Sequence, residues 1–276
     1  MMSGVFAQGP LATLVTIYGW RTVMWGLGGA GLVLAFFIAV FVRDIPANGP
    51  AIKVPKQSWA NIGKGLREAF SDWGVWKIAI VASTMSGPML TLGGLWGTPY
   101  MESAYNLGTP AAASAVSAIF FGWAFGAPFS GWLSDRIRRR KIILVTGAGV
   151  LTLALGTLVF GPKLPLTGTV ILFALMGISG GAMSVCFALV RECSPPAIGT
   201  SVTGIVNSMT VASGAILQPV VGYILDQFWT GNVINGAPVY QEAEFETAFI
   251  AIFVAVLVGF VTTLTLKETP IWKPGK

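Results

Sequence analysis

The chain has 276 residues, of which 54% are hydrophobic and 10% are charged, with a mean hydropathy of +0.74 and a formal net charge of +6. Soluble domains carry about 25% charged residues, so this composition excludes an ordinary soluble protein and predicts a protein of the lipid bilayer. Nucleic-acid binding is not expected, because nearly all of the positive residues lie in gaps between apolar runs. The sequence has no His, and we expect neither a metal site nor another cofactor.

The N-terminal region holds one short apolar run and one long one. Val5 to Tyr18 would span roughly 21 Å as a helix, which is less than the roughly 30 Å hydrocarbon core of a bilayer. It lacks the basic start of a signal peptide, since no Lys or Arg precedes Arg21, and we interpret it as the tail of a helix. Trp20 to Val42 is the first full span, and its glycines favour close packing against another helix.

Residues 43–73 form the longest polar segment of the chain, and two prolines interrupt its start. Within it, Ser58 to Phe70 predicts an amphipathic helix, because its apolar residues recur on one face at i, i+3 and i+4 spacing. These residues are Trp59, Ile62, Leu66 and Phe70. We interpret the segment as a linker on the inner membrane surface, with a solvated loop as the alternative.

Six further apolar runs follow, each long enough to cross a bilayer. They are Val75 to Tyr100, Ala111 to Ser134, Ile142 to Phe160, Leu166 to Val190, Ser201 to Leu225 and Thr247 to Leu266. If the connections alternate between the two sides, all 17 Lys and Arg residues except Arg21 and Lys163 fall on the side of the linker. Positive residues favour the cytoplasmic side, so the sequence predicts an all-α polytopic transmembrane bundle with a cytoplasmic C-terminus.

The connection that follows Ser134 carries five positive charges in a gap too short to be a domain. From Gly131 to Lys141 the sequence reads Gly-Trp-Leu-Ser-Asp-Arg-Ile-Arg-Arg-Arg-Lys. This spacing resembles the Gly-x-x-x-Asp-(Arg/Lys)-x-Gly-(Arg/Lys)-(Arg/Lys) motif of the major facilitator superfamily, with matches at Gly131, Asp135, Arg136, Arg139 and Arg140. Arg138 stands where that motif has its second Gly. An ordinary basic loop without a motif is the alternative interpretation.

The resemblance implies roles for this stretch. Gly131 would let a neighbouring helix approach, and Asp135 would pair with an Arg or accept hydrogen bonds from a helix start. Together the matching residues would form a latch that closes the cytoplasmic side in one state of a transporter. Arg191 and Glu192, near the end of a later span, would assist this latch or belong to an ordinary charged loop.

A second resemblance lies at the N-terminus, where Tyr18-Gly19-Trp20-Arg21 is similar to the junction of the fifth and sixth helices of the same superfamily. It implies the C-terminal six-helix half of a major facilitator fold, one preceding helix and a helix stub, with most of the N-terminal half missing. The implied domains are 1–42, the end of the N-terminal half; 43–73, the linker between halves; 74–267, the C-terminal half; and 268–276, a cytoplasmic tail. We expect a multi-pass protein of the bacterial inner membrane. Its partners would be the lipid bilayer, a small-molecule solute and the missing half.

Polar and large side chains near the middle of the expected spans are the candidate solute-binding residues. They are Thr84, Thr91, Trp123, Ser179, Met183, Asn207 and Gln218. In the superfamily, helices seven, eight, ten and eleven line the central cavity, so the resemblance places these residues there. The alternative is structural, because Ser and Thr often bond their own helix backbone, and Trp and Met usually pack. Asn207 and Gln218 are the strongest candidates, since a polar group is costly to place inside a membrane.

The sequence contains no catalytic or nucleotide-binding motif, so we do not expect an enzyme. The resemblance predicts a secondary active transporter that moves a small polar solute by alternating access. A non-transporting remnant or a helix-bundle interaction subunit is the alternative. The pattern is most similar to the sugar-phosphate-permease-like or metabolite-permease branch, whose organophosphate exchangers use a mid-membrane Arg on the seventh helix. Here that helix has only Lys77, at its inner end, which favours a neutral or zwitterionic sugar, amino acid or small peptide.

Overall fold

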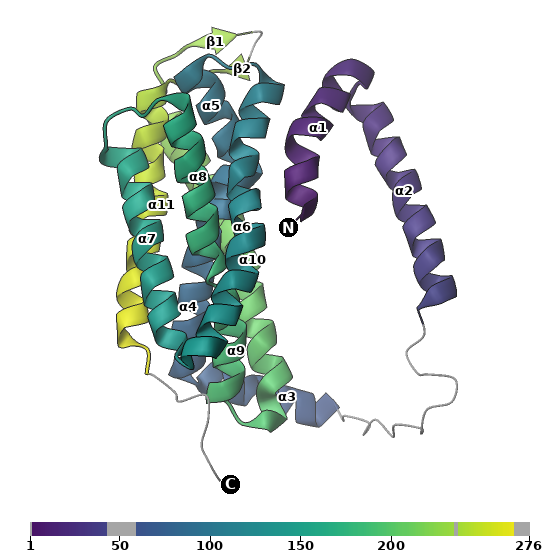
Figure 1. Ribbon diagram of the computed structural model, residues 1–276, viewed down its shortest axis with the longest axis vertical. Helices are drawn as coiled ribbons and strands as arrows, with labels where there is room; N and C mark the ends of the chain where they lie inside the picture. The colour runs from purple at the N-terminus through teal and green to yellow at the C-terminus, as the bar shows by residue number, and fades with distance from the viewer. Residues whose placement is uncertain (1, 43–58, 235–236, 268–276) are drawn as a thin grey trace.

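The structure is a computed structural model that describes residues 2–42, 59–234 and 237–267, and it is built almost entirely of helices (Figure 1). The helices are α1 Met2–Tyr18, α2 Trp20–Phe41, α3 Trp59–Ser71, α4 Trp73–Pro88, the π-helix η1 Met89–Trp96, α5 Gly97–Tyr105, α6 Thr109–Ile137, α7 Arg140–Phe160, α8 Leu166–Gly181, α9 Ser184–Cys193, the 3₁₀ turn η2 Pro196–Ile198, α10 Gly199–Phe228 and α11 Glu242–Thr265. Two short antiparallel strands, β1 Val233–Ile234 and β2 Ala237–Pro238, form a ribbon between α10 and α11.

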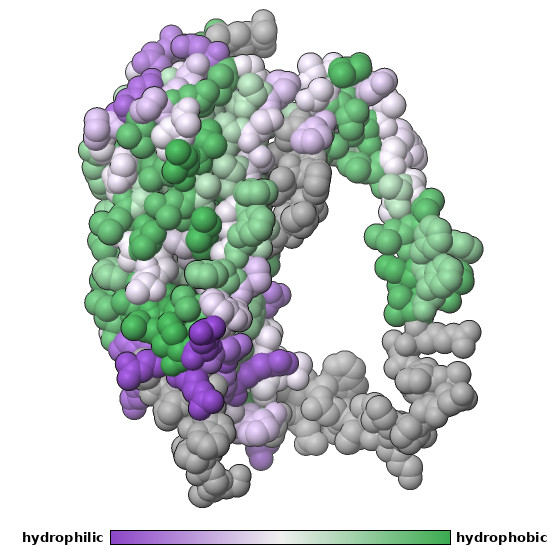
Figure 2. Space-filling model, in the orientation of Figure 1, coloured by the Kyte–Doolittle hydropathy of each residue, from purple (hydrophilic) through white to green (hydrophobic). Residues whose placement is uncertain are grey.

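Within the described residues, seven helical segments are long and apolar enough to cross a membrane. They are Trp20–Phe41, Trp73–Tyr105, Thr109–Ile137, Arg140–Phe160, Leu166–Cys193, Gly199–Phe228 and Glu242–Thr265. Each segment overlaps one expected full span, with bounds that differ by up to five residues, and together they confirm the all-α polytopic fold class. Figure 2 shows hydrophobic side chains along the middle of the bundle and hydrophilic residues gathered at its two ends. A bilayer favours this distribution, because its core has no water to solvate polar groups.

Two of the expected spans are interrupted helices. α4 ends at Pro88, which cannot donate a backbone hydrogen bond, and the chain continues as the π-helix η1 before α5 begins. α8 ends at Gly181, and in the turn before α9 the amide of Met183 donates to the carbonyl of Gly180 at 3.0 Å. Pro and Gly are the weakest helix formers, so both breaks are consistent with the sequence, although α6 and α10 continue through Pro128 and Pro219.

The contact between α6 and α8 is made through glycines of both helices. Gly122 and Gly126 of α6 face Gly177 and Gly181 of α8, so each helix contributes one Gly-x-x-x-Gly pair. A Cβ at any of the four would overlap backbone atoms of the opposing helix. The two backbones therefore touch directly, which is a common mode of helix association in lipid, where the hydrophobic effect does not drive helices together.

Small residues also bring α4 close to α10 and α11. The hydroxyl of Ser86 on α4 donates to the carbonyl of Thr210 and lies 3.2 Å from the hydroxyl of Ser213, both on α10. On another side of α4, Thr84 lies against Gly259 of α11. The helix that leads into the π-helix break is therefore held from two sides.

The two N-terminal helices lie beside the six-span bundle (Figure 1). α1 packs along α6, whereas α2 has no buried residue among those described. A Cβ added at the glycines of α2 would meet nothing within 4 Å; these are Gly26, Gly28, Gly29 and Gly31. Among the described residues no helix approaches these glycines, so the close packing expected of them stays a prediction.

The linker helix expected over Ser58 to Phe70 is present as α3, which confirms its helical state over Trp59–Ser71. α3 lies across one end of the bundle (Figure 1), where Ala69 is fully buried and Gly65 lies against η2 and α10. Leu66 and Phe70 are exposed, although the ring of Phe70 also lies against that of Trp76 on α4, with ring centres 5.7 Å apart. Contact of that apolar face with the membrane surface stays a prediction. Residues 43–58 and 268–276 lie outside the described part of the chain.

The two ends of the bundle differ in charge. The basic end, as we call it, carries the α6–α7 turn, the α9–η2 link and the end of α11 (Figure 1). Its positive residues include Lys77, Arg136, Arg138, Arg139, Arg140, Lys141, Arg191 and Lys267. The opposite end, the acidic end, carries the β-ribbon and the α7–α8 loop, with Glu102, Asp226, Glu242 and Glu246 nearby. This separation agrees with the alternating path that the sequence predicts.

Candidate functional site

The α6–α7 turn is organised around the guanidinium of Arg140, the first residue of α7. Arg140 donates to Glu192 of α9 at 2.8 Å and to the hydroxyl of Ser134 on α6, and it pairs with the carboxylate of Asp135. One side chain therefore joins the ends of three consecutive spans. We call these four residues the Arg140 cluster.

The partners of Arg140 differ in how strongly they are shielded from water. The Arg140 side chain is 8% exposed, whereas that of Asp135 is 66% exposed and that of Glu192 is 28% exposed. An exposed ion pair contributes roughly 0–1 kcal/mol, while a buried charge left without a partner is far more costly. We therefore expect the Glu192 pair to contribute more stability than the Asp135 pair.

The turn between α6 and α7 contains a residue in the left-handed region, Arg138, with φ 57° and ψ 32°. Gly adopts this conformation freely, whereas a residue with a Cβ is strained there by roughly 1–2 kcal/mol. The motif that the sequence resembles has Gly at this position. The chain thus keeps the backbone conformation that favours Gly, although an Arg occupies it.

Replacing Arg138 with Gly should stabilise the folded protein by about 0.5–1 kcal/mol, because relief of strain exceeds the greater flexibility that Gly gives the unfolded chain. Thermal unfolding of the purified protein in detergent measures this effect. Arg139→Gly is the matched control, since it removes the same charge at a residue with an ordinary φ of −139°. If Arg138→Gly melts no higher than Arg139→Gly, the turn is not strained.

Three other motif residues lie outside the Arg140 cluster. A Cβ added at Gly131 would meet nothing within 4 Å, so the described residues include no helix in close approach there. The guanidinium of Arg136 lies 5.4 Å from the ring centre of Trp132, a cation–π contact on the helix surface. Arg139 is exposed and precedes the first turn of α7. A role for these residues in gating stays a prediction.

A second feature is a groove of about 500 Å³ beside the η1 break, where α10 runs past it. Gln218 of α10 donates from Nε2 to the carbonyl of Leu90 at 2.8 Å. In return, the indole N–H of Trp96 donates to the backbone carbonyl of Gln218 at 3.0 Å. We call these two bonds the η1–α10 clasp. Leu90 can accept the bond because a π-helix shifts the regular backbone hydrogen-bonding pattern.

The groove combines aromatic rings, an amide and a carboxylate. Its lining consists of Leu95, Trp96, Ala215, Gln218, Pro219, Gly222, Tyr223 and Asp226. Tyr240 lies edge-on to Trp96, with ring centres 6.3 Å apart, and donates its phenol proton to Asp226. Burial and this hydrogen bond raise the pKa of Tyr240 to about 12, so the phenol remains a donor at neutral pH. The lining residues thus offer ring faces and hydrogen-bonding groups but no cation.

Of the seven predicted solute-binding residues, Gln218 lines the groove. Thr84 and Ser179 donate their hydroxyls to carbonyls of their own helices, at 2.8 Å and 2.7 Å respectively. Trp123 is 3% exposed and packs against Gly180 of α8. Solute contact by these three residues stays a prediction.

The remaining predicted residues lie in three different settings. Thr91 is fully buried in η1, and its hydroxyl has no hydrogen-bond partner in the described part of the chain. Met183 is buried in the turn between α8 and α9. Asn207 is exposed on α10, where an uncovered amide on a membrane helix would be costly against lipid. Solute contact by these residues stays a prediction.

Sequence reasoning alone does not identify Ser134 in the cluster or Trp96 and Tyr223 in the groove. For Trp96 a signal exists, because Pro88 and the pair Gly93-Gly94 precede it on the same helix. A Pro and two Gly within two helical turns weaken the backbone hydrogen bonding, so backbone carbonyls are expected to be free to accept bonds from side-chain donors. Ser134 and Tyr223 carry no comparable signal, since Ser and Tyr are common throughout membrane helices.

The sequence matches a known family along its whole length. The family model described as Major Facilitator Superfamily matches residues 1–163 and 92–276. The chain belongs to the Major Facilitator Superfamily. The curated relatives in this superfamily are transport proteins rather than enzymes. Membership also makes this chain a multi-pass membrane protein, as its composition predicts.

Three bacterial relatives illustrate the similarity. The chain is 27% identical over 237 residues to the probable nitrate/nitrite transporter NarK2 of Mycobacterium tuberculosis, covering 81% of this chain and 57% of the relative. It is 24% identical over 296 residues to a probable L-galactonate transporter of Escherichia coli, covering 99% and 61%. It is 31% identical over 231 residues to the putative metabolite transport protein YfiG of Bacillus subtilis, covering 80% and 44%. The chain therefore spans about half the length of these superfamily members.

Solved structures show the same fold. A bacterial homolog to the human lysosomal transporter Spinster, in an inward-facing and unoccupied conformation, matches with a TM-score of 0.68 at 16% identity. The match covers 99% of this chain and 70% of that one. The same transporter in its occupied inward-facing conformation matches with a TM-score of 0.66. The chain therefore shares the fold of these structures over nearly its whole length.

Proposed function

We propose that the chain supplies the C-terminal half of a secondary active transporter, which moves a small polar solute by alternating access. The observation that carries this proposal is the η1–α10 clasp beside an open groove. Irregular backbone at membrane depth is tolerated where it lines a cavity or is covered by protein, and broken helices commonly form transporter sites. The names of the relatives, which refer to nitrate/nitrite, L-galactonate and metabolites, support transport of a small polar solute.

The proposal includes an arrangement of the chain in the membrane. Residues 1–42 would end the N-terminal half, 43–73 would link the halves, 74–267 would form the C-terminal half, and 268–276 would be a tail. The basic end would face the cytoplasm of a bacterial inner membrane, because Lys and Arg are retained on that side. The C-terminus would then be cytoplasmic, and the uncovered face of α2 would meet the N-terminal half.

The groove favours a neutral or zwitterionic solute over an anion. Its lining carries the carboxylate of Asp226 and no cation, so it would repel an anionic solute. Trp96 and Tyr223 offer ring faces, and Gln218 offers an amide, which together suit a sugar, an amino acid or a small peptide. The solute of this chain would therefore differ in charge from the nitrate and galactonate in the names of two relatives.

Uptake into proteoliposomes tests the proposal, with the protein produced together with any in-frame segment encoded upstream of Met1. A suitable panel holds a neutral hexose, an amino acid, a dipeptide, L-galactonate and nitrate. Trp96→Phe and Gln218→Met should each slow uptake by about fivefold, because each removes one hydrogen bond worth about 1 kcal/mol. Trp132→Phe is the matched control, because Trp132 lies exposed on α6 away from the groove.

The possible results separate the two parts of the proposal. A folded protein that moves none of these solutes faster than empty liposomes would contradict the transport function. Uptake that is slowed equally by Trp96→Phe and by Trp132→Phe would contradict a specific role for the clasp while leaving transport intact.

A further inference from the structure

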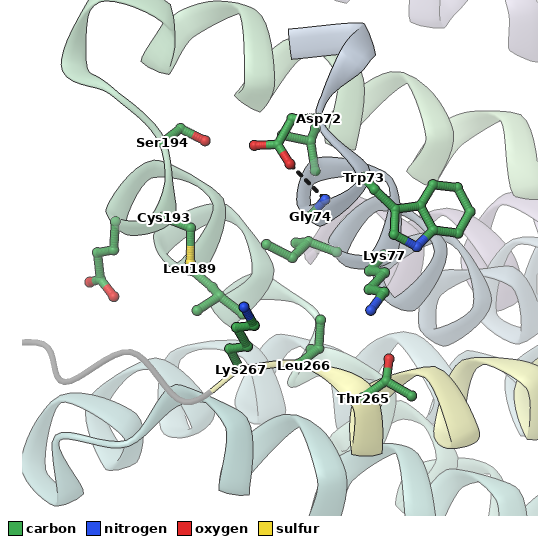
Figure 3. A pocket seen from close by; sticks show the side chains of 13 residues that line it. Asp72, Trp73, Gly74, Lys77, Leu189, Cys193, Ser194, Thr265, Leu266 and Lys267 are labelled. Carbon is green, nitrogen blue, oxygen red and sulfur yellow. Dashed lines mark hydrogen bonds between the residues drawn. The ribbon is translucent and has the colours of Figure 1, made fainter.

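A second cavity lies at the basic end of the bundle, away from the groove. It encloses about 620 Å³ between the start of α4, the end of α9 and the end of α11 (Figure 3). Val75, Ile78 and Leu189 give it an apolar wall, and the rest of its lining is largely polar or charged. It therefore has the mixed lining that an amphiphilic ligand requires.

The two carboxylates in this lining already have partners. Asp72 is the N-cap of α4 and accepts a hydrogen bond from the amide of Gly74 at 2.7 Å. Glu192 belongs to the Arg140 cluster and accepts from the guanidinium at 2.8 Å. Each of the two carboxylates thus already accepts a hydrogen bond from the protein, one from a helix start and the other from an Arg.

Unlike the carboxylates, the two cations in the lining lack partners among the described residues. Lys77 of α4 and Lys267, which follows α11, have no hydrogen-bond or ion-pair partner within the part of the chain that the structure describes. Figure 3 shows their side chains on either side of Leu266. Among the described residues, the cavity lining therefore holds two ammonium groups that pair with no other side chain, one from α4 and one from the segment after α11, besides the two carboxylates.

An independent observation points to a ligand that accepts hydrogen bonds. Ser194 lines the cavity and is 8% exposed, and its hydroxyl has no partner among the described residues. Figure 3 shows this hydroxyl directed from the end of α9 toward Asp72, at the start of α4. A buried hydroxyl without a partner is unfavourable, so a bound group that accepts a hydrogen bond from it would stabilise the site.

We propose that this cavity binds a phosphate group, held by the ammonium groups of Lys77 and Lys267 and by the hydroxyl of Ser194. Phosphate is dianionic or monoanionic and offers several strong acceptor oxygens, which matches two cations and one hydroxyl donor. Trp73 lies at the mouth of the cavity and is 65% exposed, as is typical of residues at a membrane interface. A phospholipid headgroup and a soluble phosphate share this chemistry, and the site binds either one independently of transport.

Native mass spectrometry of the delipidated protein tests this site directly. Phosphatidylglycerol should bind, and a diacylglycerol with the same chains but no phosphate should not. The double variant Lys77→Gln/Lys267→Gln should bind phosphatidylglycerol at least about tenfold more weakly, because it loses two charge-assisted contacts. The matched control is Lys64→Gln/Arg67→Gln, which removes two exposed charges of α3 outside the cavity.

Ser194→Ala gives a second measurement, whose expected result differs from that for a hydroxyl with a purely structural role. Without ligand this variant should unfold at the same temperature as the parent protein or higher, because it loses an unpartnered buried hydroxyl. With phosphatidylglycerol its affinity should fall by about fivefold. Lower stability without ligand, together with unchanged lipid affinity, would assign Ser194 to packing alone and overturn the site.

Inorganic phosphate distinguishes the two sources of the ligand. Displacement of the lipid by millimolar phosphate would support a site for soluble phosphates, and resistance to displacement would support a site for the lipid headgroup. The proposal is overturned if the diacylglycerol binds as well as phosphatidylglycerol. It is also overturned if the cavity variant and the α3 control bind the lipid equally.

Discussion

Replacing Gly126 with Ala should separate α6 from α8 and destabilise the bundle by about 2 kcal/mol or more. The added Cβ would overlap the carbonyl oxygen of Ile178 and lie within 2.6 Å of its Cα. These are backbone atoms of an opposing helix and cannot rotate away, so the helices must shift and lose the contacts along their whole interface. Unfolding of the purified protein by heat or by denaturing detergent measures the loss, with monomer size checked by gel filtration.

Gly131→Ala on the same helix is the matched control. It makes the same chemical change five residues further along α6, where an added Cβ would meet nothing within 4 Å. In a helix Ala is favoured over Gly by about 1 kcal/mol, so this variant should be as stable as the parent protein or more stable. Equal stability of the two Ala variants would show that the glycine contact between α6 and α8 is not close.

Removing the guanidinium at Arg140 should destabilise the basic end of the bundle by roughly 2 kcal/mol or more. Arg140→Gln leaves Glu192 without its main partner and places two carboxylates near each other, those of Asp135 and Glu192. The loss should exceed that of Asp135→Asn, because the Asp135 side chain is largely exposed. Thermal unfolding measures each variant, and uptake by the complete transporter measures the proposed gating role, which Asp135→Asn should also impair.

The control for this prediction is Arg139→Gln, which removes one positive charge from the neighbouring exposed residue. It should leave stability within about 0.5 kcal/mol of the parent protein. A double-mutant cycle of Arg140→Gln with Glu192→Gln should show that the two losses are not additive. Strictly additive losses would mean that the contact between these side chains contributes nothing to stability.

The same contacts bear on how the proposed transporter would move. The Arg140 cluster joins α6, α7 and α9 at the basic end, and at the acidic end Lys163 pairs with Glu242 at 2.6 Å. Between the ends, the glycine contact holds α6 against α8. We therefore expect the six-span half to move as a rigid unit in alternating access, with bending limited to the η1 break.

Part of the candidate site follows from sequence. The spacing from Gly131 to Arg140 identifies the turn, and two of its five matching residues, Asp135 and Arg140, meet in the structure. In the sequence, nothing distinguishes Glu192 from the other acidic residues near span ends. Its role appears only in the fold, where α9 lies beside the start of α7 and Arg140 reaches Glu192. Gln218 stands out because an amide is costly in a membrane span, but its partners Leu90 and Trp96 lie more than a hundred residues away.

Sequence by itself determined that this chain threads a membrane, roughly where its spans lie, and how its charges divide between two ends. Those properties depend on local composition. The free energy of transferring a span into lipid depends mainly on the residues of that span, and the side on which a loop stays depends mainly on its own Lys and Arg residues. Only the tertiary structure decided which helices touch, that two Gly-x-x-x-Gly pairs face each other, and that α10 clasps the π-helix. In lipid, helix contacts depend on packing and hydrogen bonds between distant segments, and those partners are fixed only when the helices assemble.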